Sequence, residues 1–267
     1  IVAGCITEGI VPKIKQIDEN ISFVNTHNFG RISTVVENSL NGTVLELLDK
    51  KYELKVNLPS VRKNPVVGIV PILNGCNYFC TFCSTKLVKG KLFSYPMDAI
   101  RQDVKEHLKD GCKEIWITSN DTGAYMVEQG GKQKLVELLE QILSVPMDFK
   151  VRVGMMNPGN TIPILDELIE IYKNPKMFKF LHIPLQSGNN EILKLMNRKY
   201  TVEEFVAVVE AFRKEIPEIA ISTDIIVGFP SETEQNFEDS LNLLKKIKPD
   251  VLNLSRYAVR EGTIAAK

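Results

Sequence analysis

Three cysteines lie within eight positions of this 267-residue chain, in the segment Cys76-Asn-Tyr-Phe-Cys80-Thr-Phe-Cys83. They directly follow the most apolar run of the sequence, residues 66–73, which has the length and the β-branched content of a buried strand. Three thiolates on one short loop can bind three irons of a [4Fe–4S] cluster and leave the fourth iron without a protein ligand. Because an open iron can bind a substrate or a cofactor, the C-x3-C-x2-C spacing predicts a catalytic cluster.

A zinc site is the main alternative for these thiols. Zinc in a structural site takes four ligands, usually as two separated pairs. The fourth ligand here would have to be Cys112, His107 or His182, and none of them lies at that spacing. A disulfide framework is not expected, because the chain has five cysteines, an odd number, and no secretory signal. Cys112, between a predicted helix and a predicted strand, is expected to be a buried thiol that acts as a small apolar side chain.

The elements around the cysteine loop follow the pattern of repeated βα units. From residue 66 onward, short β-branched runs alternate with longer amphipathic segments, which favours a mostly parallel sheet. Strands are predicted at 66–73, 114–119, 151–155, 180–185, 220–227 and 251–257. Helices are predicted at 96–110, 132–143, 161–172, 201–214 and 232–247, the first between Pro96 and Gly111. Six such units make a partial barrel or an open doubly wound sheet, and both bind ligands at the carboxyl ends of the strands.

Residues 1–60 differ from the rest and are predicted to be part of a smaller α/β domain with a helix at 31–38. A linker at 57–65 separates them from a second domain at 61–267. The chain balances 33 Lys+Arg against 33 Asp+Glu, so a nucleic acid or membrane partner would need a local basic patch rather than bulk charge. No apolar stretch reaches the roughly 18 residues of a membrane-spanning helix, so no span is expected.

The cysteine loop also resembles a known family. In Gly75-Cys-Asn-Tyr-Phe-Cys-Thr-Phe-Cys83 an aromatic residue, Phe82, precedes the last cysteine, and the loop is similar to the cluster loop of the radical S-adenosylmethionine (SAM) superfamily. The resemblance implies a partial (β/α)6 barrel, a [4Fe–4S] cluster on Cys76, Cys80 and Cys83, and SAM bound at the open iron. It further implies reductive cleavage of SAM to a 5′-deoxyadenosyl radical, which attacks a C–H bond that no acid or base in a protein can activate.

Further segments resemble one subfamily, the methylthiotransferases. Its shared signature blocks are similar to residues 182–188, 193–201 and 224–233. Its archaeal and eukaryotic branch is most similar at 83–90, 114–125 and 153–158. This resemblance implies a tRNA methylthiotransferase that adds a methylthio group to C2 of N6-threonylcarbamoyladenosine beside the anticodon. The alternatives are a methylthiotransferase acting on isopentenyladenosine tRNA or on a ribosomal protein, and a non-catalytic metal-containing RNA-binding module.

Four positions depart from the subfamily pattern. Ser231 and Met126 stand where glycine is common, and Val259 and Glu261 replace prolines. None of these is a predicted cluster ligand, but Ser231 and Met126 affect the conformation of loops that are expected near the cofactor.

The resemblance covers nearly the whole chain and implies further parts. Members of the subfamily carry an N-terminal domain whose three cysteines hold a second [4Fe–4S] cluster, and Ala3-Gly-Cys5 matches the last of these three. Cys5 is therefore a predicted ligand of that second cluster in the full-length protein. The chain is expected to begin part-way into this domain, and a small RNA-binding β-barrel is expected to follow residue 267.

Eight residues are predicted to contact SAM, from the resemblance and from their places at strand ends. They are Phe82 over the adenine; Ser119 and Asp121 at the amino group; Arg152, Gln186 and Ser187 at the ribose or carboxylate; Arg198 at the carboxylate; and Gly228, whose backbone approaches the adenine. For each of them, a cap, a salt bridge or a turn is the structural alternative. No catalytic acid or base is predicted.

Three cations, Lys86, Lys89 and Lys91, follow the cysteine loop. A tRNA backbone passing the site would meet them, and a solvated charge run is the alternative. The expected partners are tRNA, an electron donor and a sulfur donor. The chain is expected to be a cytoplasmic monomer with no membrane partner.

Overall fold

The computed structural model describes residues 1–59 and 61–267, and residue 60, at the predicted domain boundary, lies outside the described residues. Parallel strands form two groups of three, in the orders β4-β7-β8 and β11-β10-β9. Their bounds are β4 Val67–Pro71, β7 Glu114–Thr118, β8 Lys150–Val153, β9 Phe180–His182, β10 Ala220–Val227 and β11 Val251–Arg256. A bridge between Val151 and Met177 and a hydrogen bond from the Met156 N–H to the His182 carbonyl (3.0 Å) join β8 to the start of the second group.

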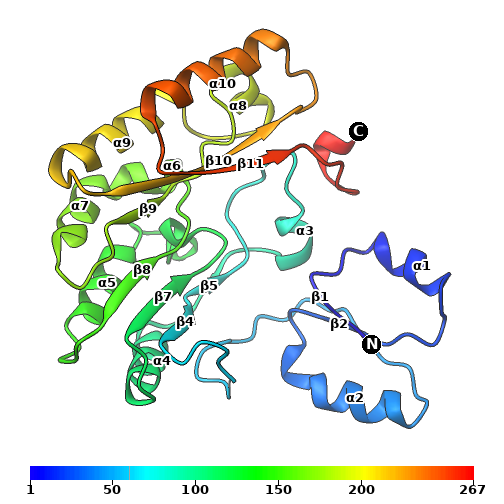
Figure 1. The fold of residues 1–267 in the computed structure, drawn as a ribbon. Coiled ribbons are helices and arrows are strands. Elements are labelled where there is room, and N and C mark those ends of the chain that lie inside the picture. The colour runs from blue at the N-terminus through cyan, green and yellow to red at the C-terminus, as the bar shows by residue number, and fades with distance from the viewer. Residues whose placement is uncertain (60) are drawn as a thin grey trace.

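The sheet curves but does not close. Among the described strands, β4 and β11 are the outer edges and do not pair with each other. Helices cover the outer side of the curve in Figure 1. They are α4 Met97–Lys109, α5 Leu135–Leu143, α6 Pro158–Thr161, α7 Leu165–Lys173, α8 Asn190–Leu195, α9 Val202–Glu215 and α10 Glu234–Ile247. The predicted partial barrel is therefore confirmed over the doubly wound alternative, which would place helices on both faces.

Successive side chains of a strand point alternately toward the covering helices and into the barrel interior. Ile115 and Ile117 on β7 are fully buried under the helices, whereas Trp116 between them is partly exposed. Gly68 on β4 lets α4 approach closely, because a Cβ there would lie 2.8 Å from the His107 side chain. The interior therefore receives every second strand residue, and these side chains meet at the carboxyl ends of the strands.

Local signals fix several helix ends. Thr201 and Glu204 form a reciprocal capping box at the start of α9, and Thr233 and Asn236 form another at α10. Gly111 follows α4 with φ +94°, as the predicted helix end requires.

Several strands end one to three residues earlier than predicted, and the ends of β4 and β9 change the path of the chain. β4 stops at Pro71, and β5 (Leu73–Asn74) then pairs antiparallel with β6 (Phe93–Ser94). β9 stops at His182 instead of residue 185, because Pro184 has no N–H for the ladder and Gln186 adopts φ +79°. Both breaks turn the chain at the end of the barrel where the cysteines lie.

The N-terminal part has its own small parallel sheet, in the order β1-β2-β3. Its elements are β1 Val2–Gly4, α1 Ile10–Lys15, β2 Phe23–Asn25, the 3-10 turn η1 Phe29–Arg31, α2 Ile32–Leu40 and β3 Glu46–Leu47. The predicted helix at 31–38 is thus observed as α2. Buried His27 connects this part to α3 (Thr85–Lys89), since its ring nitrogens face the Lys51 carbonyl (2.7 Å) and the Val88 carbonyl (2.9 Å). Figure 1 shows the N-terminal sheet and its helices set beside the barrel.

Replacing Ser231 with glycine is expected to stabilise the chain. Ser231 is exposed and adopts φ +71°, in the left-handed region where glycine carries no Cβ penalty. Relief of about 1–2 kcal/mol of strain, less the entropy that glycine adds to the unfolded state, leaves a net gain of about 0.5–1 kcal/mol. Urea denaturation of Ser231→Gly and Ser231→Ala checks this; equal midpoints for the two variants would contradict the explanation.

Candidate functional site

The cluster loop, residues 75–83, begins at the one position where its path requires glycine. Gly75 has φ +80°, and a Cβ there would lie 2.0 Å from the Lys91 carbonyl oxygen. Distant segments then hold the loop in place: the Thr81 N–H donates to the Met196 carbonyl (3.1 Å), and the Ala265 N–H donates to the Thr81 carbonyl (2.9 Å). The loop is thus bound on one side by the end of α8 and on the other by the last segment of the chain, which lies near α3 in Figure 1.

Each of the three loop thiols accepts one N–H hydrogen bond at sulfur. The Tyr78 N–H lies 3.4 Å from the Cys76 Sγ, and the Thr85 N–H lies 3.4 Å from the Cys83 Sγ. The third sulfur, on Cys80, receives Arg198 Nη1 at 3.1 Å. Hydrogen bonds to sulfur are a feature that tunes cluster thiolates, so this donor set fits an iron–sulfur cluster.

The spacing of the donors also bears on the zinc alternative. In the described part of the chain, no three His, Cys, Asp or Glu side chains converge on the position of a single ion. A cluster needs no such convergence, because each iron of the cube takes one thiolate.

Protonation of the loop thiols depends on burial. Burial raises the pKa of Cys76 to about 11, against the lowering effect of the Tyr78 N–H. The protein alone thus keeps this thiol protonated at neutral pH, and a metal must displace the proton when it binds.

A buried polar chain supports the cluster loop from the β7 side. Asp121 is only 2% exposed; its carboxylate accepts the Asn157 N–H (3.0 Å) and the Asn160 amide (2.7 Å). The Asn160 amide also reaches the Asn77 side-chain oxygen in the loop (3.3 Å). Burial raises the pKa of Asp121 to about 6, despite the hydrogen bonds that favour the carboxylate. The geometry makes Asp121 a support of the loop, and its predicted contact with the SAM amino group stays a prediction.

A cavity of about 700 Å³ opens beside the cluster loop, within the usual size range of cofactor sites. Phe82 and Cys83 of the cluster loop line it, and so does Gln186. Phe82 meets Phe229 edge-on at 6.5 Å, and Phe229 meets Tyr257 at 5.6 Å. The cavity is therefore aromatic near the cysteines. Its further lining residues are Ser84, Thr85, Asp224, Ile225, Ile226, Asn253, Ser255, Arg256, Tyr257, Ala258 and Arg260.

Gln186 adopts φ +79°, which is rare for a residue with a Cβ. Its backbone is held on both sides, because its N–H donates to the Asp224 carbonyl (2.8 Å) and its carbonyl accepts the Ile226 N–H (3.0 Å). Strained residues that are over-determined in this way cluster at ligand sites. Gln186 lines the cavity, and its predicted contact with SAM stays a prediction.

Asp224, which lines the cavity, is the centre of a polar group. Its carboxylate lies 3.1 Å from His182 Nε2 and accepts the Asn253 amide at 2.7 Å. Burial opposes ionisation, but the hydrogen bonds from His182 and Asn253 outweigh it and lower the pKa of Asp224. The group therefore presents a fixed negative charge to the cavity at neutral pH.

Replacing Asp224 with asparagine is expected to destabilise the chain at pH 7 by about 1–2 kcal/mol, the size of hydrogen bonds to a charged group. Since the pKa of Asp224 is lower in the folded state, its contribution is complete above the unfolded pKa near 4 and is lost as pH falls through the folded value. Urea midpoints measured at pH 7 and pH 3 for Asp224→Asn, with exposed Asp148→Asn as the control, test this. A difference that is as large at pH 3 as at pH 7 would contradict it.

The other predicted SAM contacts lie in different surroundings. The Arg152 guanidinium is inside the barrel between the rings of Trp116 (4.8 Å) and Phe180 (4.5 Å). Ser119 accepts the Asp121 N–H at 3.1 Å. Ser187 is fully buried and accepts the Asn189 N–H. These three, like Asp121, are involved in protein contacts, and their roles at SAM stay predictions.

Gly228 and Cys5 lie outside the 700 Å³ cavity. Gly228 has φ +72° and lines a separate hollow of about 310 Å³ before α10. Cys5 is exposed directly after β1. Cys112, as predicted, is buried.

Several cavity residues were not predicted as ligand contacts. Asp224 and Asn253 share a register position on β10 and β11, and Ser255 lies two residues further along the same face. The inward alternation of the last two predicted strands would have identified them. Arg256 and Arg260 follow at the strand end, where a parallel barrel gathers its ligand contacts.

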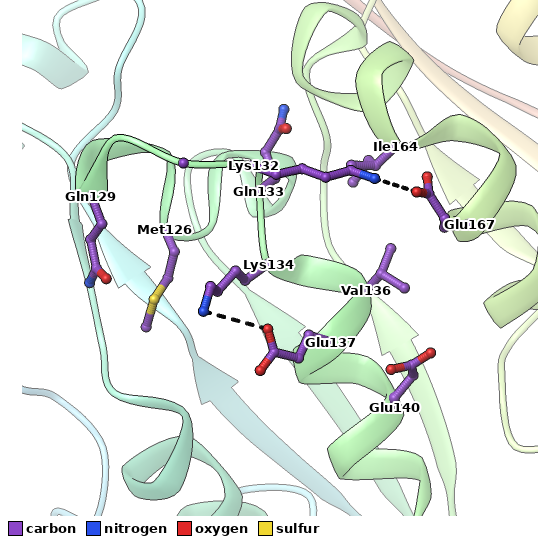
Figure 2. A pocket seen from close by; sticks show the side chains of 11 residues that line it. Met126, Gln129, Lys132, Gln133, Lys134, Val136, Glu137, Glu140, Ile164 and Glu167 are labelled. Carbon is purple, nitrogen blue, oxygen red and sulfur yellow. Dashed lines mark hydrogen bonds and ion pairs between the residues drawn. The ribbon is translucent and has the colours of Figure 1, made fainter.

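A second cavity, of about 540 Å³, lies between α5, the 3-10 turn Val127–Gln129 and Glu167 of α7 (Figure 2). Lys132 points to Glu167 and pairs with it, and Lys134 pairs with Glu137 at 3.6 Å. None of the predicted site residues lines it.

Comparisons with known proteins bear on both the fold and the site. The sequence profile of the Radical SAM superfamily matches residues 70–244. A Pyrococcus horikoshii protein named probable threonylcarbamoyladenosine tRNA methylthiotransferase is 45% identical over 271 residues, covering 100% of this chain and 63% of the relative. The Drosophila melanogaster threonylcarbamoyladenosine tRNA methylthiotransferase is 38% identical over 276 residues, covering 100% of this chain and 49% of the relative. The chain thus spans less than two thirds of the length of these relatives.

Solved structures are similar in fold. The cobalamin-dependent S-adenosylmethionine radical enzyme OxsB matches with a TM-score of 0.65 at 12% identity, over 99% of this chain and 41% of that one. The radical S-adenosylmethionine methyltransferase TsrM from Kitasatospora setae matches with a TM-score of 0.62 at 15% identity, over 75% of this chain and 38% of that one. In the described part of the chain, no helix has the length and apolarity needed to cross a membrane.

Proposed function

The chain belongs to the Radical SAM superfamily, and from this premise we propose that it is the catalytic core of a cytoplasmic tRNA methylthiotransferase. The proposed reaction adds a methylthio group to C2 of N6-threonylcarbamoyladenosine beside the anticodon. The observation that carries the proposal is 45% identity to a protein of that name over the whole chain. The three loop thiols beside a 700 Å³ cavity agree with it.

The superfamily implies SAM and a [4Fe–4S] cluster, which we propose is held by Cys76, Cys80 and Cys83. When bound, these groups supply the one-electron chemistry that breaks a SAM bond and activates a substrate C–H bond. The residues of this chain position and shield them. The aromatic group of Phe82, Phe229 and Tyr257 limits water on one side of the cavity, and we propose that Phe82 covers the adenine of SAM. Arg256 and Arg260 add positive charge to the cavity lining, where a carboxylate or phosphate would bind.

An exposed aromatic residue beside cations supports RNA as the substrate. Phe79, in the cluster loop, is 61% exposed. Lys86 Nζ lies 4.2 Å from the centre of the Phe79 ring and donates to the Cys76 carbonyl at 2.6 Å. The lysine therefore covers one face of the ring and is itself held in place. Single-stranded RNA is bound by stacking on aromatic rings and by cations along the backbone. Phe79 with Lys89 and Lys91 offers both features next to the cysteines.

Reversing charge at Lys89 and Lys91 is expected to weaken tRNA binding by about tenfold or more and to reduce the salt dependence by roughly one phosphate contact per residue. Among the described residues, neither lysine forms an ion pair. The double variant Lys89→Glu, Lys91→Glu is compared with Lys132→Glu, Lys134→Glu in the second cavity (Figure 2). Filter binding across a salt series would contradict the proposal if both double variants bound alike.

We propose that residues 1–60 and 61–267 are two domains and that Cys5 is a ligand of a second cluster in the full-length protein. The separate β1-β2-β3 sheet supports the division. Cys5 is exposed directly after β1, so its thiol is open to a cluster whose other ligands come from elsewhere in such a domain. The sulfur donor and the electron donor are proposed as further partners, and the chain as a monomer.

The proposed function is tested on tRNA itself. The full-length protein, reconstituted without oxygen, is incubated with SAM, a reductant, sulfide and tRNA that carries N6-threonylcarbamoyladenosine. Mass spectrometry of digested nucleosides is expected to show the modified adenosine heavier by CH2S. Parallel incubations contain isopentenyladenosine tRNA or a ribosomal protein. A gain of this mass on either of them, with none on the expected nucleoside, would overturn the substrate assignment.

A further inference from the structure

Arg198 touches the cluster loop from a segment far away in the sequence. Its Nη1 donates to the Cys80 Sγ at 3.1 Å, across 118 positions of the chain. The same guanidinium donates through Nε to the Tyr200 hydroxyl (2.8 Å) and through Nη2 to the Pro184 carbonyl (3.3 Å). All three kinds of guanidinium nitrogen thus have a partner, and the orientation of the group is fixed.

Tyr200 makes this arrangement rigid. Its hydroxyl is buried and lies 2.6 Å from the Leu185 carbonyl, so it donates there and accepts from Arg198. The Arg198 guanidinium centre also lies 4.9 Å from the Tyr200 ring centre. Because a guanidinium is always ionised in proteins, a positive charge is held permanently against the Cys80 sulfur.

The three loop sulfurs differ in this respect. Cys76 and Cys83 accept hydrogen bonds from the neutral backbone N–H groups of Tyr78 and Thr85. Among the described residues, Cys80 alone accepts from a charged side chain. Charge-assisted hydrogen bonds are about twice as strong as neutral ones, so the Cys80 contact dominates the polar surroundings of the thiols.

We propose that Arg198 is a positioning residue that raises the reduction potential of the cluster through its hydrogen bond to the Cys80 sulfur. Reduction adds one electron from the external reductant to the cluster and makes the three-thiolate site more negative. A fixed cation and an N–H donor at sulfur stabilise the reduced state more than the oxidised state, which shifts the potential upward. This role differs from the predicted contact of Arg198 with the SAM carboxylate.

The test is a redox titration of the reconstituted chain without SAM, followed by the electron paramagnetic resonance signal of the reduced cluster. Arg198→Met is expected to shift the midpoint to a more negative potential. Lys86→Met is the matched control, because Lys86 brings a cation to the Cys76 carbonyl oxygen but none to sulfur, and it is expected to change the midpoint less. An unchanged midpoint in Arg198→Met, or equal shifts in both variants, would overturn the proposal.

A second measurement does not depend on Arg198→Met, which could fail to hold a cluster, because its main sample is the protein with Arg198 in place. Electron–nuclear double resonance of the reduced cluster, with isotopically labelled arginine nitrogen, is expected to show a nitrogen coupling that disappears in Arg198→Lys. No arginine coupling would overturn the proposal. The inference rests on the cluster of the proposed function and not on the tRNA substrate. If no cluster formed, both the proposed function and the role of Arg198 would be wrong. If a cluster formed without the arginine coupling, only the role of Arg198 would be wrong.

Discussion

Gly75→Ala is expected to abolish iron incorporation into the chain. The alanine Cβ would lie 2.0 Å from the Lys91 carbonyl oxygen and 2.6 Å from its carbon, and backbone atoms cannot swing away as a side chain does. Strain from the left-handed φ of +80° adds about 1–2 kcal/mol. The loop must therefore shift at the residue next to Cys76, and iron per chain after anaerobic reconstitution should fall about tenfold or more.

The chain provides a matched control for this variant. Gly111 also has a left-handed φ, +94°, but a Cβ there meets no atom within 4 Å. Gly111→Ala should lose about 1–2 kcal/mol of stability and keep its iron. If the two variants lost iron equally, backbone strain rather than the contact with Lys91 would be the cause, and the role assigned to Gly75 would be wrong.

Loss of any one loop thiol is expected to reduce SAM cleavage to the background rate, whereas loss of either remaining cysteine is not. In Cys80→Ala the cluster loses one of its three thiolates and the acceptor of the Arg198 hydrogen bond. Cys112→Ala leaves a small cavity in a buried position and should cost stability alone. Cys5→Ala changes an exposed thiol after β1.

The measurement is 5′-deoxyadenosine formed per chain by each of the five Cys→Ala variants, normalised to folded protein. We expect background cleavage from the variants of Cys76, Cys80 and Cys83, and normal cleavage from the variants of Cys5 and Cys112. Full cleavage by Cys80→Ala, or none by Cys112→Ala at normal stability, would contradict the assignment of the ligands.

The barrel could be predicted from the sequence because its strands and helices are long enough to show a period. The predicted strand at 220–227 and the predicted helix at 201–214 lie within one residue of β10 and α9. The short elements could not be predicted in this way. α8 has 6 residues and α3 has 5, less than two turns each, so neither shows a helical repeat.

The site, too, has parts that the sequence predicts and parts that it does not. Spacing within one loop identifies Cys76, Cys80 and Cys83, because local sequence alone determines that these thiols share a loop. The contact of Arg198 with Cys80 joins residues 118 positions apart, and its existence depends on how the end of α8 packs against the loop. Likewise, the sequence places Asp121 at a strand end, but not beneath the loop with both carboxylate oxygens already bonded.

His27 shows the converse. No motif marks it, yet it joins the N-terminal part to α3 through the Val88 carbonyl. Its role comes from how the N-terminal part lies against α3, which no local pattern encodes.

The central claim is that this chain supports radical SAM chemistry at its three loop thiols. The most direct measurement is anaerobic reconstitution with iron and sulfide, followed by reduction in the presence of SAM and chromatography of the products. We predict about four irons per chain, one cluster's worth, and formation of 5′-deoxyadenosine. Zinc in place of iron, or an intact cluster that yields no 5′-deoxyadenosine, would contradict the claim.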